Sequence, residues 1–149
     1  MKSIVELDVE LPRERVATLF ADPENSTAWM HDLAKYEPIS GQLGAQGFKY
    51  RLTPKKGDMV FVATVISNDL PNATSVDLRA ARVSVAVTAR FIAISPSRSR
   101  LVSVEVFTFK GVVGKIMGLF AGGAIRKAHR EHMESFKRFA ERRGRADTA

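Results

Sequence analysis

The sequence predicts a single α+β domain in which one long C-terminal helix crosses the concave face of a curved antiparallel sheet. Residues 33–110 form a succession of short apolar segments separated by turn residues, which is typical of an antiparallel meander of about six or seven strands. Residues 112–142 instead repeat apolar side chains at steps of three and four, which indicates one amphipathic helix. The length of 149 residues suits one domain with a substantial core.

Composition excludes several classes of protein. The chain is 45% apolar and 26% charged and contains no cysteine, so disulfide frameworks, thiol catalysis and thiolate metal sites are excluded. The first ten residues alternate like a strand and do not resemble a signal peptide. No apolar run approaches the roughly 18 residues that a membrane-spanning helix needs. We therefore expect a cytoplasmic protein, with no cofactor.

Positive charge is concentrated near the C-terminus. The net charge is +7, and residues 110–145 carry 10 Lys or Arg against 3 acidic residues. We interpret this as the solvated face of the terminal helix, with a weak contact to an anionic surface as the alternative. Aromatic residues are not interleaved with the basic ones, so no specific nucleic acid is expected as a partner.

The first 30 residues predict a strand followed by two short helices. Residues 3–11 alternate between apolar and polar side chains, as a half-buried strand does. Pro12 then suits the start of a helix, and Asp22-Pro23 ends it, because a residue before proline avoids the α region. Residues 24–30 predict a second short helix.

Turn residues divide the next part of the chain into strands. Pro54 and Gly57 mark one turn, and Pro71 and Pro96 mark two others. The strands predicted between these turns span residues 33–40, 48–53, 59–66, 75–81, 82–94 and 100–109. After them we expect one helix over residues 112–142, with a weak point at Gly122-Gly123, and a disordered polar tail over residues 143–149.

Local motifs in the first 30 residues resemble those of a known superfamily. Pro12-Arg13-Glu14-Arg15-Val16 after the first strand, Phe20-Ala21-Asp22-Pro23-Glu24 and Ala28-Trp29-Met30 are similar to the helix motifs of the SRPBCC superfamily. That superfamily contains START domains, polyketide cyclases and dehydratases, and the major birch-pollen allergen. The resemblance covers nearly the whole chain over residues 1–142. It implies the helix-grip fold and a cavity for an apolar molecule, on a scaffold shared by carriers and enzymes.

A cavity between sheet and helix would be lined by apolar side chains from both. Small residues along the helix stripe leave volume there, although each lining candidate could equally pack a dry core. The candidates are Val83, Val85, Val87, Phe91, Val102, Val104, Val106, Met117, Phe120, Ala121, Ala124, Ile125, Ala128, His132 and Phe136.

His132 is the candidate catalytic residue, because it lies within the apolar stripe and histidine titrates near neutral pH. The alternative is a histidine hydrogen-bonded at the edge of the core. His129 is expected at the border of the stripe, and no third ligand accompanies the pair, so no metal site is predicted. Glu105 is expected to face solvent; Arg51, Arg90 and Glu105 would each become candidate ligand contacts if their strand faces pointed inward.

The residues favour a non-catalytic binder of a hydrophobic small molecule, such as a lipid, an isoprenoid or an aromatic polyketide-like compound. A second hypothesis, which rests on the resemblance, is a polyketide cyclase/dehydratase-type enzyme that uses the same cavity. A third is an interaction module resembling the superfamily's coenzyme Q-binding or ribosome-associated members. Oligomeric state and the identity of the ligand are left open.

Overall fold

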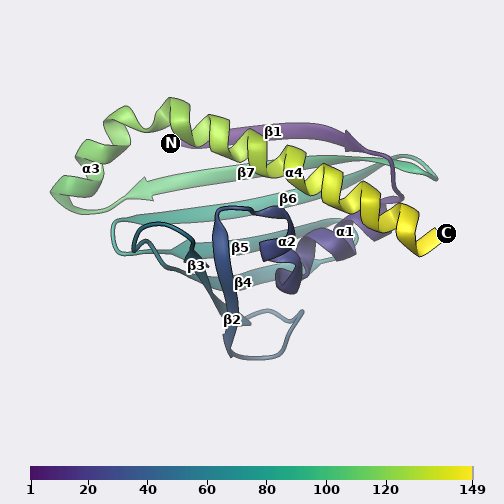
Figure 1. Cartoon of the computed structure of the whole chain (residues 1–149), viewed down its shortest axis with the longest axis horizontal. Coiled ribbons are helices and arrows are strands. Elements are labelled where there is room, and N and C mark those ends of the chain that lie inside the picture. The colour runs from purple at the N-terminus through teal and green to yellow at the C-terminus, as the bar shows by residue number, and fades with distance from the viewer. Residues whose placement is uncertain (149) are drawn as a thin grey trace.

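The computed structural model of the chain describes residues 1–148 and contains one seven-stranded antiparallel sheet (Figure 1). The strand order is β1-β7-β6-β5-β4-β3-β2, so every neighbour except β1–β7 is a consecutive hairpin. The α+β architecture predicted from the sequence is confirmed. The strands are β1 (Lys2–Val9), β2 (Leu33–Ser40), β3 (Lys49–Pro54), β4 (Phe61–Asp69), β5 (Ala73–Arg79), β6 (Val83–Ser95) and β7 (Arg98–Phe109).

Two short helical segments connect β1 to β2. Helix α1 spans Arg13–Ala21 and follows Pro12, whose φ of −58° suits the start of a helix. A 3₁₀ turn, η1 (Pro23–Asn25), leads into α2 (Ser26–Trp29). The Asp22 carboxylate accepts a hydrogen bond of 3.0 Å from the Glu24 amide and caps this turn. These segments lie on the same side of the sheet as the long terminal helix (Figure 1).

The terminal helix is divided, which corrects the prediction of one helix over residues 112–142. Helix α3 spans Gly111–Phe120 and α4 spans Gly122–Thr148, with Ala121 between them. Helix α3 stays at the end of the sheet because Gly114 and Gly118 allow it to approach β7 and the β5–β6 turn closely. Only α4 then crosses the sheet, as Figure 1 shows.

The polar end of the chain is helical rather than disordered as far as the structure describes it. Helix α4 continues to Thr148, and only Ala149 of the predicted tail lies outside the described residues. Gly144 is buried against Leu11, and Asp147 forms an ion pair with Arg15 of α1. These contacts connect distant parts of the chain, so the local polarity of the tail gave no sign of them.

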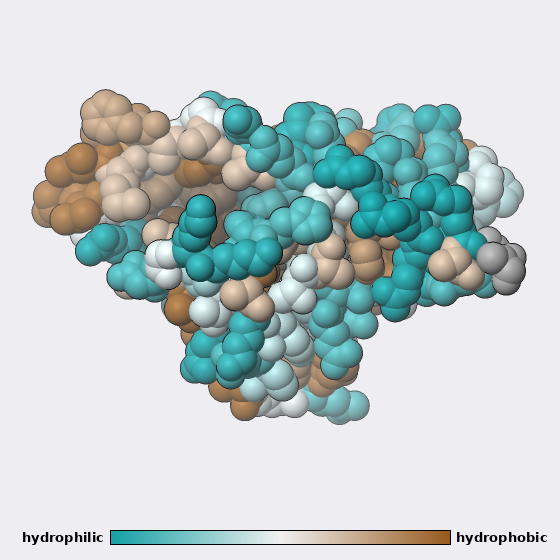
Figure 2. Space-filling model, viewed as in Figure 1, coloured by the Kyte–Doolittle hydropathy of each residue, from teal (hydrophilic) through white to brown (hydrophobic). Residues whose placement is uncertain are grey.

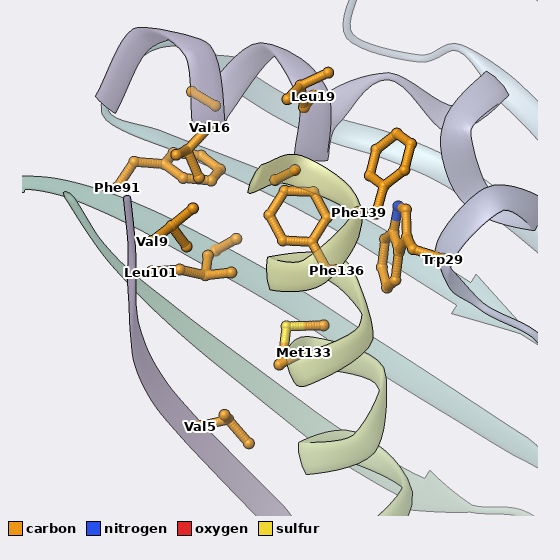
Figure 3. Packing of buried hydrophobic residues seen from close by; sticks show 13 residues of the cluster. Val5, Val9, Val16, Leu19, Trp29, Phe91, Leu101, Met133, Phe136 and Phe139 are labelled. Atoms are coloured by element: carbon orange, nitrogen blue, oxygen red, sulfur yellow. The ribbon is translucent and has the colours of Figure 1, made fainter. Parts of the chain in front are cut away.

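The core lies where α4 crosses β1, β6, β7 and α1 (Figure 3). Phe136 is at its centre, and its ring meets Phe20 at 5.0 Å and Trp29 at 5.3 Å between centroids, both edge-to-face. A second cluster under β2, β3 and β4 contains Phe48, Tyr50 and Leu52. No helix within residues 1–148 is long and apolar enough to cross a bilayer.

Two glycines of the terminal helices predict opposite stability effects. A Cβ at Gly114 would lie 2.8 Å from the Arg82 carbonyl oxygen, whereas a Cβ at Gly123 would meet nothing within 4 Å. We therefore expect Gly114→Ala to lower the free energy of unfolding by about 1–2 kcal/mol. Gly123→Ala should raise it by up to about 1 kcal/mol, because alanine is the better helix former. Urea unfolding of both variants tests the pair, and equal shifts of one sign would contradict it.

Candidate functional site

A cavity of about 270 Å³ lies between the sheet and the first half of α4. Its walls come from α1, α2, the six strands β2 to β7 and α4, so residues distant in sequence converge on it. Apolar groups dominate the lining. Aromatic rings are the largest of them, contributed by Phe20, Trp29, Phe48, Tyr50, Phe61 and Phe107.

Strands β6 and β7 form the central part of the cavity wall. Val85 pairs with Phe107 and Val87 pairs with Glu105 across the two strands, and all four side chains line the cavity. Residues paired across antiparallel strands point to the same face. Glu105 therefore points inward from the middle of an apolar wall.

Next to Glu105 lies a fully buried histidine. His129 of α4 is 1% exposed, and its ring lies between two buried serines, Ser3 of β1 and Ser103 of β7. The Nδ1 atom is 2.8 Å from Ser3 Oγ, and Nε2 is 2.9 Å from Ser103 Oγ. A neutral imidazole donates through one nitrogen and accepts through the other, so both hydroxyl groups have a partner.

Burial favours the uncharged forms of both groups. Glu105 Oε1 lies 3.7 Å from His129 Nδ1, and the Glu105 side chain is only 17% exposed. Desolvation raises the pKa of Glu105 to about 7. Desolvation, with smaller contributions from the positive charges of His132 and Arg130, lowers the pKa of His129 to about 4. At neutral pH the cavity thus contains a neutral imidazole and a carboxyl group that can accept or donate a proton.

A second histidine lies at the rim of the cavity. His132 Nε2 is 3.0 Å from Asp32 Oδ1, and the two side chains are 30% and 65% exposed. This contact joins α4 to the segment between α2 and β2 and borders the opening. Because both groups remain hydrated, their pairing contributes little to stability.

Two polar atoms of lining residues, Trp29 Nε1 and Asn68 Oδ1, are buried without a hydrogen-bond partner in the described part of the chain. The Tyr50 side chain is buried among Phe48 and Tyr36, and burial raises the pKa of its hydroxyl group above the usual value. The hydroxyl group therefore stays protonated and able to donate. Within residues 1–148, no three His, Asp or Glu side chains gather as a metal site would require.

Comparisons with known proteins identify the fold. No family model and no curated protein sequence matches the chain. Solved structures do match over nearly their whole length. The Zhui aromatase/cyclase from a Streptomyces species superimposes with a TM-score of 0.79 at 15% identity, over 99% of this chain and 97% of that one.

Two other structures agree. A START superfamily protein from Mycobacterium smegmatis gives a TM-score of 0.71 at 15% identity, with 95% of each chain covered. A norcoclaurine synthase mutant from Thalictrum, solved with a transition-state analogue, gives 0.68 at 14% identity, with 97% of each covered. The chain has the START-like helix-grip fold. At these identities the similarity shows the fold and leaves function to the site itself.

Some of the predicted lining residues border the cavity of this helix-grip domain. They are Val85, Val87, Ile125, Ala128 and His132. Phe91 and Phe136 instead belong to the packed core at the other end of α4, where α1 fills the space below the helix. Val83 is buried beyond the cavity, paired with Phe109. The helix-grip domain is thus packed solid at one end and hollow at the other.

The predicted inward face of β7 is wrong. Val102, Val104 and Val106 alternate with the buried Leu101 and Ser103 and therefore point away from α4. Both faces of this strand carry apolar residues, so alternation alone does not distinguish them. The pairing of β7 with β1 decides which face of β7 points inward, since Val5 is buried opposite Ser103.

The helix residues before Ile125 do not line the cavity either. Met117 and Phe120 are exposed on α3, and Ala121 and Ala124 lie at the junction with α4, outside the cavity lining. The break at Ala121 moves all four away from the sheet. His129, predicted at the border of the stripe, is the deeply buried histidine, because α4 packs against β1 along His129, Met133, Phe136 and Ala140.

Sequence reasoning missed most of the aromatic lining and the orientation of Glu105. The bulk of Leu101, Phe107 and Phe109 on the Glu105 face was the available signal, since large residues favour the buried side of a strand. Arg51 and Arg90, whose orientation was left open with that of Glu105, are both exposed. The lining contributed by α2 and β5 had no recognisable local signature.

Proposed function

We propose that the cavity binds a small, predominantly apolar molecule and that Glu105 receives its polar end. The observation that carries this proposal is a hollow, aromatic-lined space with one inward-facing carboxyl group. Its volume of about 270 Å³ is close to the lower end of small-molecule sites, which span roughly 300–1,000 Å³. A compact aromatic or isoprenoid guest fits this volume better than a long-chain lipid.

The charged residues of the lining favour a guest whose polar group is neutral or cationic over one whose polar group is anionic. Although the chain has a net charge of +7, the residues that line the cavity include Asp32 and Glu105 and no Lys or Arg. An anionic guest would meet no Lys or Arg side chain in the lining and would face Glu105. A hydroxyl group or a protonated amine would find an acceptor there. The guest is accordingly neutral or cationic.

A second candidate function is proton-transfer catalysis on the bound guest, as in a cyclase/dehydratase-type enzyme. A carboxyl group with a pKa of about 7 is suited to act as general acid or base near neutral pH. Glu105 joins His132 as a candidate for that role, and His129 with its two serines would hold Glu105 in place. Binding comes first in either case.

Three naphthalene compounds that differ only in their polar end test the binding proposal. We expect 2-naphthylethylamine and 2-naphthylethanol to bind at pH 8, and 2-naphthylacetate to bind at least about tenfold more weakly, because its carboxylate would face the ionised Glu105. Isothermal titration calorimetry measures all three. Equal affinities, or preference for the acid, would contradict the proposed role of Glu105.

Two phenylalanine substitutions on β6 locate the binding site. Val87 lines the cavity and its neighbour Ala86 is exposed on the opposite face. Val87→Phe should abolish binding of 2-naphthylethanol by filling the cavity, whereas Ala86→Phe should leave it unchanged. Binding that survives Val87→Phe would place the guest elsewhere. Once the site is located, native mass spectrometry of the purified protein, with extraction of any bound molecule, identifies the natural ligand.

A further inference from the structure

Helix α3 exposes an unusual number of large apolar side chains. Val112, Leu119 and Phe120 are 77%, 79% and 84% exposed, and Val113, Ile116 and Met117 are also exposed. Figure 2 shows these side chains as an apolar patch at the end of the molecule where Figure 1 places α3. An exposed contiguous apolar patch on a folded domain marks an interaction site.

The outward orientation of these side chains follows from the two glycines of the helix. Gly114 and Gly118 are one turn apart and share a face. That face lies against the sheet, because a Cβ at Gly114 would be 2.8 Å from the Arg82 carbonyl oxygen and a Cβ at Gly118 would be 2.6 Å from the Phe109 ring. The smallest residues of α3 therefore face the protein and the largest face solvent. This arrangement is the reverse of a surface helix that contributes to a core.

Basic side chains surround the apolar patch. Residues 106–130 contain no Asp or Glu. Lys115 lies within α3, Lys110 precedes it, and Arg126 and Lys127 follow on the first turns of α4; all four are exposed. An apolar helix with cationic residues at its borders suits an interface between hydrocarbon and anionic headgroups.

We propose that α3 docks on an anionic lipid bilayer, with its apolar side chains inserted among the acyl chains and the flanking Lys and Arg side chains at the headgroups. A second copy of this chain is a poor occupant, because its own patch carries the same positive charge. The patch protrudes from the end of the sheet, so a deformable bilayer can cover the whole of it (Figure 1). This inference does not rest on the proposed function of the cavity.

Sedimentation with phospholipid vesicles tests the proposal. We expect the full chain to sediment with vesicles of phosphatidylcholine and phosphatidylserine, and this binding to weaken as salt is added. The Leu119→Ser/Phe120→Ser double variant should bind at least about tenfold more weakly. Ile94→Ser serves as the control, because Ile94 is 44% exposed in β6 beside the Ser95–Arg98 turn, far from α3. It should bind like the unmodified chain.

Charge reversal provides an independent readout. Lys115→Glu/Arg126→Glu should remove the preference for phosphatidylserine over pure phosphatidylcholine vesicles. Thermal unfolding and uptake of 2-naphthylethanol should be unchanged in both double variants, which separates this inference from the function of the cavity. Vesicle binding that is absent, or unaffected by both double variants, would overturn the proposal. So would self-association that the Leu119→Ser/Phe120→Ser variant abolishes without any vesicle binding, because a second copy would then cover the patch.

Discussion

Replacing Phe136 by alanine is expected to lower the free energy of unfolding by about 3–5 kcal/mol. The ring is fully buried and lies edge-to-face against Phe20 and Trp29, with Phe139 at 6.3 Å. Its removal leaves a cavity where α1, α2 and α4 meet, and edge-to-face aromatic contacts are lost as well. Urea unfolding monitored by circular dichroism measures the difference.

Phe120→Ala is the matched control for this substitution. It removes the same atoms from a side chain that is 84% exposed on α3, so the free energy of unfolding should change by less than about 0.5 kcal/mol. A small effect of Phe136→Ala would mean that the contacts around α4 are looser than the structure shows. The pair therefore tests the division of the terminal helix into a packed part and an exposed part.

Glu105→Gln is expected to raise the free energy of unfolding at pH 8 by up to about 3 kcal/mol and to have almost no effect at pH 4.5. The pKa of Glu105 is about 7 in the folded chain, against 4.5 for an unperturbed glutamate. Below the lower value both states are protonated. Between these two pKa values the folded state binds more protons than the unfolded state, so stability falls as pH rises. Above pH 7 the carboxyl group is ionised in both states, and the full cost of burying its charge is present. Glutamine removes that cost.

The buried histidine has the opposite pH dependence. The pKa of His129 is about 4 in the folded chain against 6.5 unperturbed, so the folded state loses stability as pH falls from 6.5 through 4. In the unmodified chain the two effects oppose each other over this interval. In the Glu105→Gln variant only the His129 effect remains of these two. The free energy of unfolding of this variant should therefore rise clearly from pH 4 to pH 6.5.

Urea unfolding at several pH values measures both effects. Glu6→Gln is the control, because Glu6 is exposed on the neighbouring strand β1; its effect should be small at every pH. A Glu105→Gln variant that is less stable at pH 8 would show that the carboxylate has a favourable partner in the folded chain. The inward carboxyl group would then be structural, and the proposed ligand preference would lose its basis.

The local sequence pattern was sufficient to predict the strands and the first helices. Alternation over residues 3–11 and the Asp22-Pro23 stop depend on interactions within a few residues, so the sequence carries them in readable form. The same holds for the hairpin order, because turn residues separate consecutive strands. The motifs around Pro12 and Trp29 added the identity of the fold, which the structural comparisons support.

Which face of each strand and helix points inward could be decided only from the tertiary structure. Strand β7 carries apolar residues on both sides, and its pairing with β1, about 100 residues earlier in the chain, turns Glu105 inward and Val104 outward. Helix α4 buries His129 and leaves His132 at the rim because of where it crosses β1, and both histidines fit the stripe in the sequence.

The sequence by itself therefore determined the strands, the first helices, their order and the existence of a concave sheet covered by a helix. Only the tertiary structure decided which part of that helix covers it. The absence of a side chain at Gly114 and Gly118 allows α3 to lie close to Arg82 and Phe109 at the end of the sheet, and the helical periodicity of residues 112–142 does not encode this approach. Periodicity records which side chains share a face; it does not record what that face meets, since this depends on long-range packing.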